Sequence, residues 1–286
     1  MFGTLHLIML GVCAAVCAAM CVFLRKLRLK QWYKILMWVG IVSETVKVFT
    51  YILRNEQTYG GYLPKTDLPF HLCSIQLIFI ALLNFTHSEK LHRVLLAFMM
   101  PSCLVGGLAA ILIPTSSSLT IPVITVQYFM YHTVIVAFAI YLFYCREIEW
   151  TAKDWGNALK MLCFLTFVAI YVNSICYDVV EFTNVDGVKT VEYVSRVNFM
   201  YVVDPPVEGL PFLNKNHGWL VYFAHLAFTG LTAVTLCYIK PVVKAIKNRG
   251  KKAPAASGAL PDAHAGTLPD APIEETNVFA ENKANN

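Results

Sequence analysis

The chain has 286 residues, of which 57% are hydrophobic and only 14% are charged. Soluble domains carry about 25% charged residues, so this composition excludes an ordinary soluble protein and indicates a membrane protein. The net charge of +5 comes mostly from basic residues gathered in particular connections, a pattern that reflects membrane orientation and not nucleic-acid binding.

Seven apolar stretches are each predicted to cross the membrane, because a bilayer core about 30 Å thick requires about 20 apolar residues per helix. The third stretch is short for a span, and Pro101 interrupts the fourth, where we expect a kink. The predicted fold is therefore all-α, a polytopic bundle of seven transmembrane helices within residues 1–245. The stretches lie near residues 4–24, 33–53, 70–86, 93–114, 122–144, 157–177 and 217–239.

Basic residues predict the orientation of this bundle. They are frequent after the first, third, fifth and seventh stretches and rare in the alternate connections. The connection 178–216, for example, has six acidic and three basic residues. Since basic connections stay in the cytoplasm, we expect a multi-pass protein of the cell membrane with its N-terminus outside and its C-terminus in the cytoplasm.

Two segments lie outside the predicted spans. In the connection 178–216, polarity alternates on both sides of Asp186 and Gly187, which predicts a β-hairpin outside the membrane. Such a loop either covers an outward-facing site or simply joins two helices. Residues 246–286 are rich in Ala, Pro, Gly, Asp and Lys and are too polar to form a core, so we predict a disordered cytoplasmic tail.

The nine cysteines lie mostly within apolar stretches and include no Cys-x-x-Cys pair. This usage indicates neither a disulfide framework nor a zinc site. Nucleotide-binding and metalloprotease motifs are also absent from the sequence. We therefore predict no metal ion and no organic cofactor.

Polar side chains within or beside the apolar stretches mark the predicted site, because a charge at membrane depth costs about 3 kcal/mol unless it is paired. Glu44 and Lys47 are three residues apart on one face of the second helix, so they can pair. We expect the polar set to face one cavity that opens to the outer surface. The set comprises Glu44, Lys47, His71, Cys73, Gln76, His132, Asn173 and Asn198.

Cys73 and His132 have the side chains required for acyl transfer. At a helix N-terminus near Asp67 and Pro69, the helix dipole would favour the Cys73 thiolate. His71 would lie about 200° around that helix from Cys73, so the base is expected to be His132. The alternative is that Cys73 is only a small apolar residue of a membrane helix.

Four short motifs resemble those of the YwaF-like family of bacterial integral membrane proteins. The family is similar to a eukaryotic protein, transmembrane protein 164, which is regarded as an acyltransferase acting on ether phospholipids. The resemblance spans roughly residues 30–240 and implies a membrane enzyme with phospholipid and lysophospholipid substrates. The motifs are Glu44-x-x-Lys47, Leu68-Pro69-Phe70-His71-Leu72-Cys73, Tyr131-His132 and Asn198-Phe199-Met200-Tyr201.

The chain departs from the eukaryotic pattern at the proposed nucleophile. In those proteins a Cys directly precedes the His of the third-helix motif, whereas this chain has Phe70 there. The available thiol, Cys73, lies three positions later, while the His of the fifth helix corresponds to His132. The resemblance therefore implies either a relocated nucleophile or loss of the activity.

Three classes of function remain open from the sequence. The leading hypothesis is a phospholipid acyltransferase or acyl hydrolase, with Cys73 as nucleophile, His132 as general base and the other polar residues shaping the substrate pocket. The second is a small-solute transporter or proton-relay permease, which would be sensitive to Glu44→Gln and indifferent to Cys73→Ala. The third is a non-catalytic membrane assembly protein, in which neither substitution would matter. All three have membrane lipids as partners, and none requires nucleic acid.

Overall fold

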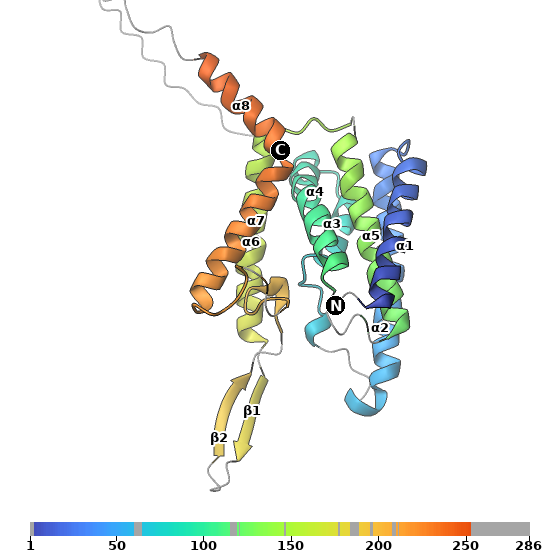
Figure 1. Ribbon diagram of the computed structural model, residues 1–286. Coiled ribbons are helices and arrows are strands. Elements are labelled where there is room, and N and C mark those ends of the chain that lie inside the picture. Colours follow the sequence, from blue (N-terminus) through green and yellow to red (C-terminus); the bar gives the residue numbers. More distant parts are fainter. Residues whose placement is uncertain are drawn as a thin grey trace, which may run out of the picture.

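The computed structural model describes residues 3–59, 65–114, 119, 121–145, 147–176, 178–183, 189–194, 197–207, 210 and 212–252. The helices run nearly parallel to one another, as Figure 1 shows, and the predicted helical class is confirmed. The α-helices are α1 (Thr4–Phe23), α2 (Leu29–Tyr59), α3 (Ile75–Phe85), α4 (Glu89–Leu112), α5 (Pro122–Tyr144), α6 (Ala152–Ile175), α7 (Trp219–Cys237) and α8 (Ile239–Lys252), and the short 3-10 helices are η1 (Lys65–Asp67) and η3 (Phe199–Tyr201).

Six helices of the described chain are long and apolar enough to cross a membrane, namely α1, α2, α4, α5, α6 and α7. α3 has only 11 residues and begins at Ile75, later than the predicted start near residue 70. A seventh span at α3 therefore stays a prediction. Large apolar side chains such as Phe23, Phe85, Phe167 and Leu220 are exposed on the helix surfaces, as expected where lipid is the solvent.

α4 and α5 form the centre of the bundle. α1 and α2 pack on α5, α6 and α7 pack on α4, and α3 lies between α2 and α4. Phe98 and Met99 of α4 and Phe138 of α5 are fully buried at this centre. A Cβ atom at Gly107 of α4 would lie 2.6 Å from Val136 Cγ2, so a glycine is required for the close approach of α4 to α5.

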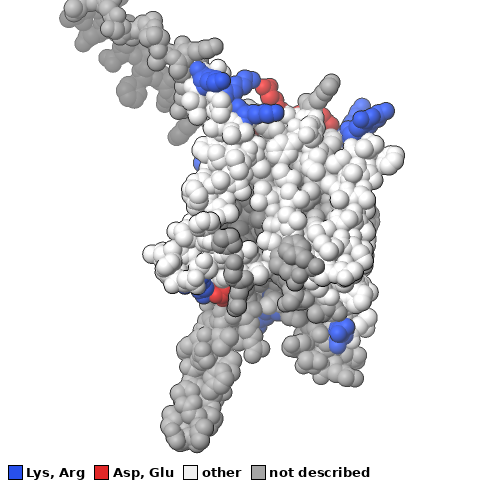
Figure 2. Space-filling model, in the orientation of Figure 1, with Lys and Arg blue, Asp and Glu red and all other residues white. Residues whose placement is uncertain are grey.

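The charged side chains lie at the two ends of the bundle, and an uncharged band lies between them (Figure 2). At the end that carries α8, Arg93 of α4 donates to both carboxylate oxygens of Asp154 of α6, at 2.7 and 2.6 Å. Asp154 also accepts bonds from the backbone N and the Oγ1 of Thr151, and the bond from the backbone N belongs to a capping box at the start of α6. One buried carboxylate thus ties α4 to α6 at the basic end.

The connection after α6 contains two strands, β1 (Asp178–Thr183) and β2 (Lys189–Val194). They pair antiparallel, with Asp178 opposite Val194 and Thr183 opposite Lys189, so the predicted hairpin is confirmed. Asp186 and Gly187, the predicted turn, lie outside the described residues. Whether this hairpin covers a site stays a prediction.

α8 corrects part of the prediction for the C-terminus. The sequence predicts disorder from residue 246, whereas α8 continues to Lys252. The reason is an amphipathic pattern in which Ile239, Val243 and Ile246 share one helix face. Residues 253–286 of the predicted tail lie outside the described part of the chain.

Candidate functional site

The segment before α3 differs from the predicted helix start at Asp67 and Pro69. Residues 68–74 form turns, in which Phe70 N donates to Leu68 O at 2.8 Å, and α3 begins only at Ile75. Pro69 has no N–H to donate and disfavours helical geometry at the residue before it, which explains the late start. The expected placement of Cys73 inside a first helical turn is therefore wrong, and with it the angular separation of Cys73 from His71.

Glu44 and Lys47 of α2 pair as predicted. Lys47 Nζ lies 2.8 Å from Glu44 Oε2 and donates to Glu44 Oε1 at 3.0 Å. The Lys47 side chain is only 12% exposed. Asp67 of η1 is close to this pair: burial raises the pKa of its carboxyl, Lys47 lowers it and Glu44 raises it. One lysine is thus shared by two carboxylates.

His71 lies in the turn segment, beside the Lys47 cluster. Burial and the charge of Lys47 lower the pKa of His71 to about 4, against the effect of a hydrogen bond with the Thr66 backbone. The imidazole is therefore neutral at pH 7. Its ring packs 5.2 Å from that of Phe199 and 5.9 Å from that of Tyr201, centroid to centroid, so His71 contacts η3.

Cys73 lies in the same turn segment and is partly buried. Burial raises the pKa of the thiol, while the Ser74 side chain and the charge of Lys47 act to lower it. Cys73 Sγ is 3.9 Å from Ser74 Oγ, and its backbone O accepts a bond from the Tyr131 hydroxyl at 2.8 Å. The net effect keeps the thiol protonated at neutral pH, so a nucleophilic role requires a base.

His132 of α5 is 3% exposed. Its Nδ1 lies 2.6 Å from Tyr128 O. Because a carbonyl oxygen only accepts, Nδ1 carries a proton. A second proton on Nε2 would bury a charge without a hydrogen-bond partner, so Nε2 has the lone pair. Nε2 is buried and has no hydrogen-bond partner in the described chain. His132 is therefore a neutral imidazole in one tautomer with an available basic nitrogen.

Tyr131 connects His132 to the turn segment. Its ring centroid is 5.7 Å from that of His132, and its hydroxyl donates to Cys73 O. Among the residues described here, no hydrogen bond joins Cys73 Sγ to His132. The predicted nucleophile, Cys73, and the predicted base, His132, thus both contact Tyr131, but no hydrogen bond of the described chain joins the Cys73 thiol to the His132 ring.

Gln76 of α3 is fully buried. Its Nε2 donates to Leu72 O and to Ser102 Oγ of α4, both at 3.0 Å, while Oε1 has no partner within the described residues. Gln76 Oε1 and His132 Nε2 are both buried acceptors, on α3 and α5. Such groups are rare in protein interiors and are commonly satisfied by a ligand or water.

Asn173 and Asn198 have backbone partners. Asn173 Nδ2 donates to Phe199 O at 3.0 Å, and Phe199 N donates to Asn173 Oδ1 at 2.9 Å. Asn198 Nδ2 donates to Asp204 O at 2.7 Å, and its Oδ1 accepts from Val203 N at 3.1 Å. Asn173 therefore ties the η3 loop to α6, and Asn198 closes this loop on itself.

The η3 loop has a strained backbone. Met200 and Tyr201 have φ angles of 55° and 56°, in the left-handed region that non-glycine residues rarely adopt. Each such residue costs about 1–3 kcal/mol, and strain of this kind concentrates at functional sites. Trp219 Nε1 donates to Val202 O at 2.9 Å, and the Tyr222 hydroxyl donates to Tyr201 O, so α7 also holds this loop. Nothing in the sequence pattern identifies this strain.

The predicted polar residues thus fall into two groups. Glu44, Lys47, His71 and Cys73 gather with Asp67 around the turn segment, with Gln76 and His132 at the adjoining helices. Asn173 and Asn198 form the second group, and their side-chain amides position η3. Sequence reasoning missed Tyr128, which fixes the His132 tautomer, and Ser102, which binds Gln76; neither stands out in an apolar stretch.

These features define a multi-pass helical membrane protein with a buried polar site near one end of the bundle. The chain belongs to the TMEM164 family, because the sequence model of this family matches residues 1–238, from α1 through α7. The predicted relation to transmembrane protein 164 is therefore confirmed, while the YwaF-like grouping stays a prediction. Searches of the curated proteins and of the solved structures give no match.

Proposed function

We propose that this protein transfers an acyl chain from a phospholipid to a lysophospholipid, with Cys73 as the nucleophile and His132 as the general base. The observation that carries the proposal is His132, whose tautomer is set by Tyr128 and whose Nε2 lies buried without a partner. A buried neutral imidazole with an available nitrogen is suited to taking a proton from a thiol.

The reaction needs two balanced steps. Cys73 Sγ attacks the ester carbonyl of the donor lipid, its proton passes to His132 Nε2, and His132 then protonates the leaving lysophospholipid oxygen. In the second step His132 removes the proton from the acceptor hydroxyl, which attacks the thioester and releases Cys73 as a thiol. Both steps require Sγ and Nε2 to come within about 3.5 Å when substrate binds, since such contacts often form only in the complex.

The charged cluster has a separate role in this scheme. The charge of Lys47 acts on Cys73, His71 and Asp67, and its mostly buried side chain pairs with Glu44. A lipid phosphate at this end of α2 would pair with Lys47. Gln76 Oε1, which is buried and unpartnered among the described residues, would accept a bond from a donor of the bound lipid other than the reacting hydroxyl, whose proton goes to His132. The cluster therefore orients the two lipids while Cys73 and His132 carry out the chemistry.

The test uses purified protein in lipid nanodiscs with a labelled phospholipid donor and a lysophospholipid acceptor. Cys73→Ala and His132→Ala are each expected to lower label transfer by at least about 100-fold, the range for loss of a nucleophile or base. The matched controls are Cys163→Ala, an exposed thiol of α6, and His225→Ala, a histidine of α7; both should transfer label normally. Transfer by Cys73→Ala at the wild-type rate would overturn the assignment.

A second function, binding or relay of a solute or proton, is favoured by the Glu44, Lys47 and Asp67 cluster. Charges that share partners in a membrane protein commonly mark a transport path. This function predicts solute flux in proteoliposomes that Glu44→Gln abolishes and Cys73→Ala leaves unchanged. Absence of both flux and acyl transfer would instead favour the non-catalytic class.

A further inference from the structure

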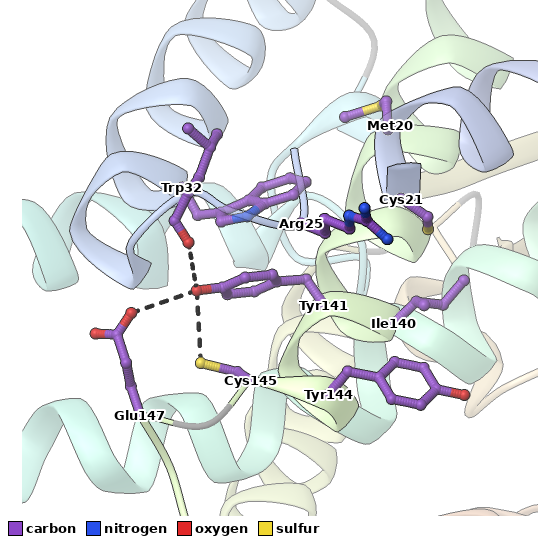
Figure 3. A pocket seen from close by; sticks show the side chains of 10 residues that line it. Met20, Cys21, Arg25, Trp32, Ile140, Tyr141, Tyr144, Cys145 and Glu147 are labelled. Carbon is purple, nitrogen blue, oxygen red and sulfur yellow. Dashed lines mark hydrogen bonds between the residues drawn. The ribbon is translucent and has the colours of Figure 1, made fainter. Parts of the chain in front are cut away.

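A cavity of about 530 Å³ lies at the basic end of the bundle, away from the turn segment that holds Cys73. It is formed by the end of α1, the start of α2, the end of α5 and the connection that follows α5 (Figure 3). Its size is within the range of ligand pockets in proteins. The lining residues are Met20, Cys21, Arg25, Leu27, Trp32, Ile140, Tyr141, Tyr144, Cys145 and Glu147.

Two opposite charges line this cavity without pairing to each other. Arg25 has no hydrogen bond or ion pair within the described residues. Glu147 is held in place because its Oε1 accepts a bond from Leu29 N at 3.0 Å and lies 3.5 Å from the Tyr141 hydroxyl. Its Oε2 has no partner in the described chain. The cavity therefore offers one cation and one carboxylate oxygen to a ligand.

The remaining walls are apolar and aromatic. Trp32 is 1% exposed and packs on Tyr141, with ring centroids 5.2 Å apart. Its Nε1 is a buried donor with no acceptor among the residues described. The Tyr141 hydroxyl is already used, since it donates to Leu27 O at 2.9 Å. A rigid aromatic wall with an unsatisfied N–H suits a ligand that brings an oxygen acceptor.

The position of the cavity, at the ends of two membrane spans, favours an amphiphilic ligand. α1 and α5 both qualify as membrane spans, and the cavity lies where they end. A lipid that enters here would place its chains along Met20 and Ile140 and its head at the level of Arg25 and Glu147. A soluble ligand would leave the apolar wall uncovered.

We propose that this cavity binds a zwitterionic phospholipid, with Arg25 on the phosphate and Glu147 on the ammonium group of the head. Arginine forms two parallel bonds to a phosphate, and a carboxylate attracts an ammonium group. A phospholipid with net negative charge would pair with Arg25 but would meet the uncompensated charge of Glu147. The binding site is independent of the acyl-transfer proposal, because it shares no residue with the Cys73 and His132 site.

Binding is tested on the full-length protein in detergent by native mass spectrometry. The probes are a phosphatidylcholine, a phosphatidylglycerol with the same acyl chains, and phosphocholine without chains. Wild type is expected to bind the phosphatidylcholine at least about tenfold more tightly than the phosphatidylglycerol, which corresponds to about 1.4 kcal/mol. Phosphocholine alone should bind far more weakly than the lipid.

Two variants separate the charges. Glu147→Gln retains the acceptor for Leu29 N but removes the carboxylate charge, so the preference for phosphatidylcholine should disappear. Arg25→Gln should weaken binding of both lipids. The matched controls, Arg28→Gln and Glu149→Gln, change exposed residues of the same end that do not line the cavity, and both should bind as wild type does.

Three results would overturn the proposal. They are equal binding of both lipids by wild type, wild-type binding by Arg25→Gln and Glu147→Gln, and binding of phosphocholine as tight as that of the lipid. Ile140→Trp provides a further check, because a larger side chain would narrow the apolar part of the cavity and weaken binding of the phosphatidylcholine. Thermal unfolding of each variant shows that a loss of binding is not a loss of fold.

Discussion

At Cys73, burial and neighbouring groups act in opposite directions on the thiol. Burial raises its pKa, whereas Ser74 and the charge of Lys47 lower it. Lys47→Gln should therefore raise the pKa further and slow alkylation of Cys73 by iodoacetamide several-fold at pH 8. The alkylated peptide is quantified by mass spectrometry, with Lys30→Gln at the opposite end of α2 as the control. An unchanged rate in Lys47→Gln would show that Lys47 does not influence the thiol.

His71 gives the protein a pH-dependent stability. Its pKa is about 4 in the folded protein, below the ordinary value of 6.5, so between these values the unfolded chain binds a proton that the folded chain does not. The free energy of unfolding contributed by His71 should therefore fall as the pH drops from about 6.5 to about 4. His71→Gln should flatten this dependence in thermal unfolding of the solubilised protein. Identical pH profiles for both proteins would contradict the assignment.

Substitution of Asp154 is predicted to have a large effect on the free energy of unfolding. It accepts two bonds from Arg93 and two from Thr151 while 2% exposed. Asp154→Asn removes the charge and should lower the free energy of unfolding by about 2 kcal/mol, because the hydrogen bonds from Arg93 and Thr151 lose their charged acceptor. Denaturant unfolding measures the change, and Glu149→Gln, an exposed residue nearby, should have no measurable effect. An unchanged free energy of unfolding in Asp154→Asn would mean that the packing of α6 does not depend on the ion pair with Arg93.

Among the elements, the contact between α4 and α5 is sensitive to an added side chain. At Gly107 a methyl group would meet Val136 at 2.6 Å and His132 O at 3.4 Å, so Gly107→Ala should destabilise the protein by about 1–3 kcal/mol. The same change at Gly156 of α6 meets nothing within 4 Å and should be neutral. Thermal unfolding of both variants provides the comparison. Equal melting temperatures would show that the two helices can move apart freely.

The elements also show what the sequence predicts well and what it does not. The long spans follow from apolar length alone, because lipid imposes a helix on each such stretch. The hairpin follows from alternation around Asp186 and Gly187. α3 begins later than the sequence predicts, because Pro69, which is acceptable in a first helical turn, instead lies in a series of turns. Glu44 and Lys47 pair as their spacing predicts, but the roles of Asn173 and Asn198 depend on contacts with η3 that are distant in the chain.

The whole molecule has different polar features at its two ends. The turn segment, η3 and the hairpin lie at one end, and the basic connections and α8 lie at the other (Figure 1). The cavity lined by Arg25 and Glu147 is at this second end. The orientation predicted from basic residues places the first end outside and the second in the cytoplasm. In sealed right-side-out membranes, a tag inserted between β1 and β2 should be cut by added protease, whereas a C-terminal tag should be protected. The reverse pattern would contradict the orientation.

The central claim is that Cys73 carries the acyl chain between two lipids. The most direct measurement is the mass of the Cys73 peptide after incubation of the protein with a phospholipid donor and no acceptor. The account predicts a mass increase of one acyl group on Cys73, which neutral hydroxylamine removes and a lysophospholipid discharges. An unmodified Cys73 in protein that still transfers label, or an acyl group on another cysteine, would contradict it.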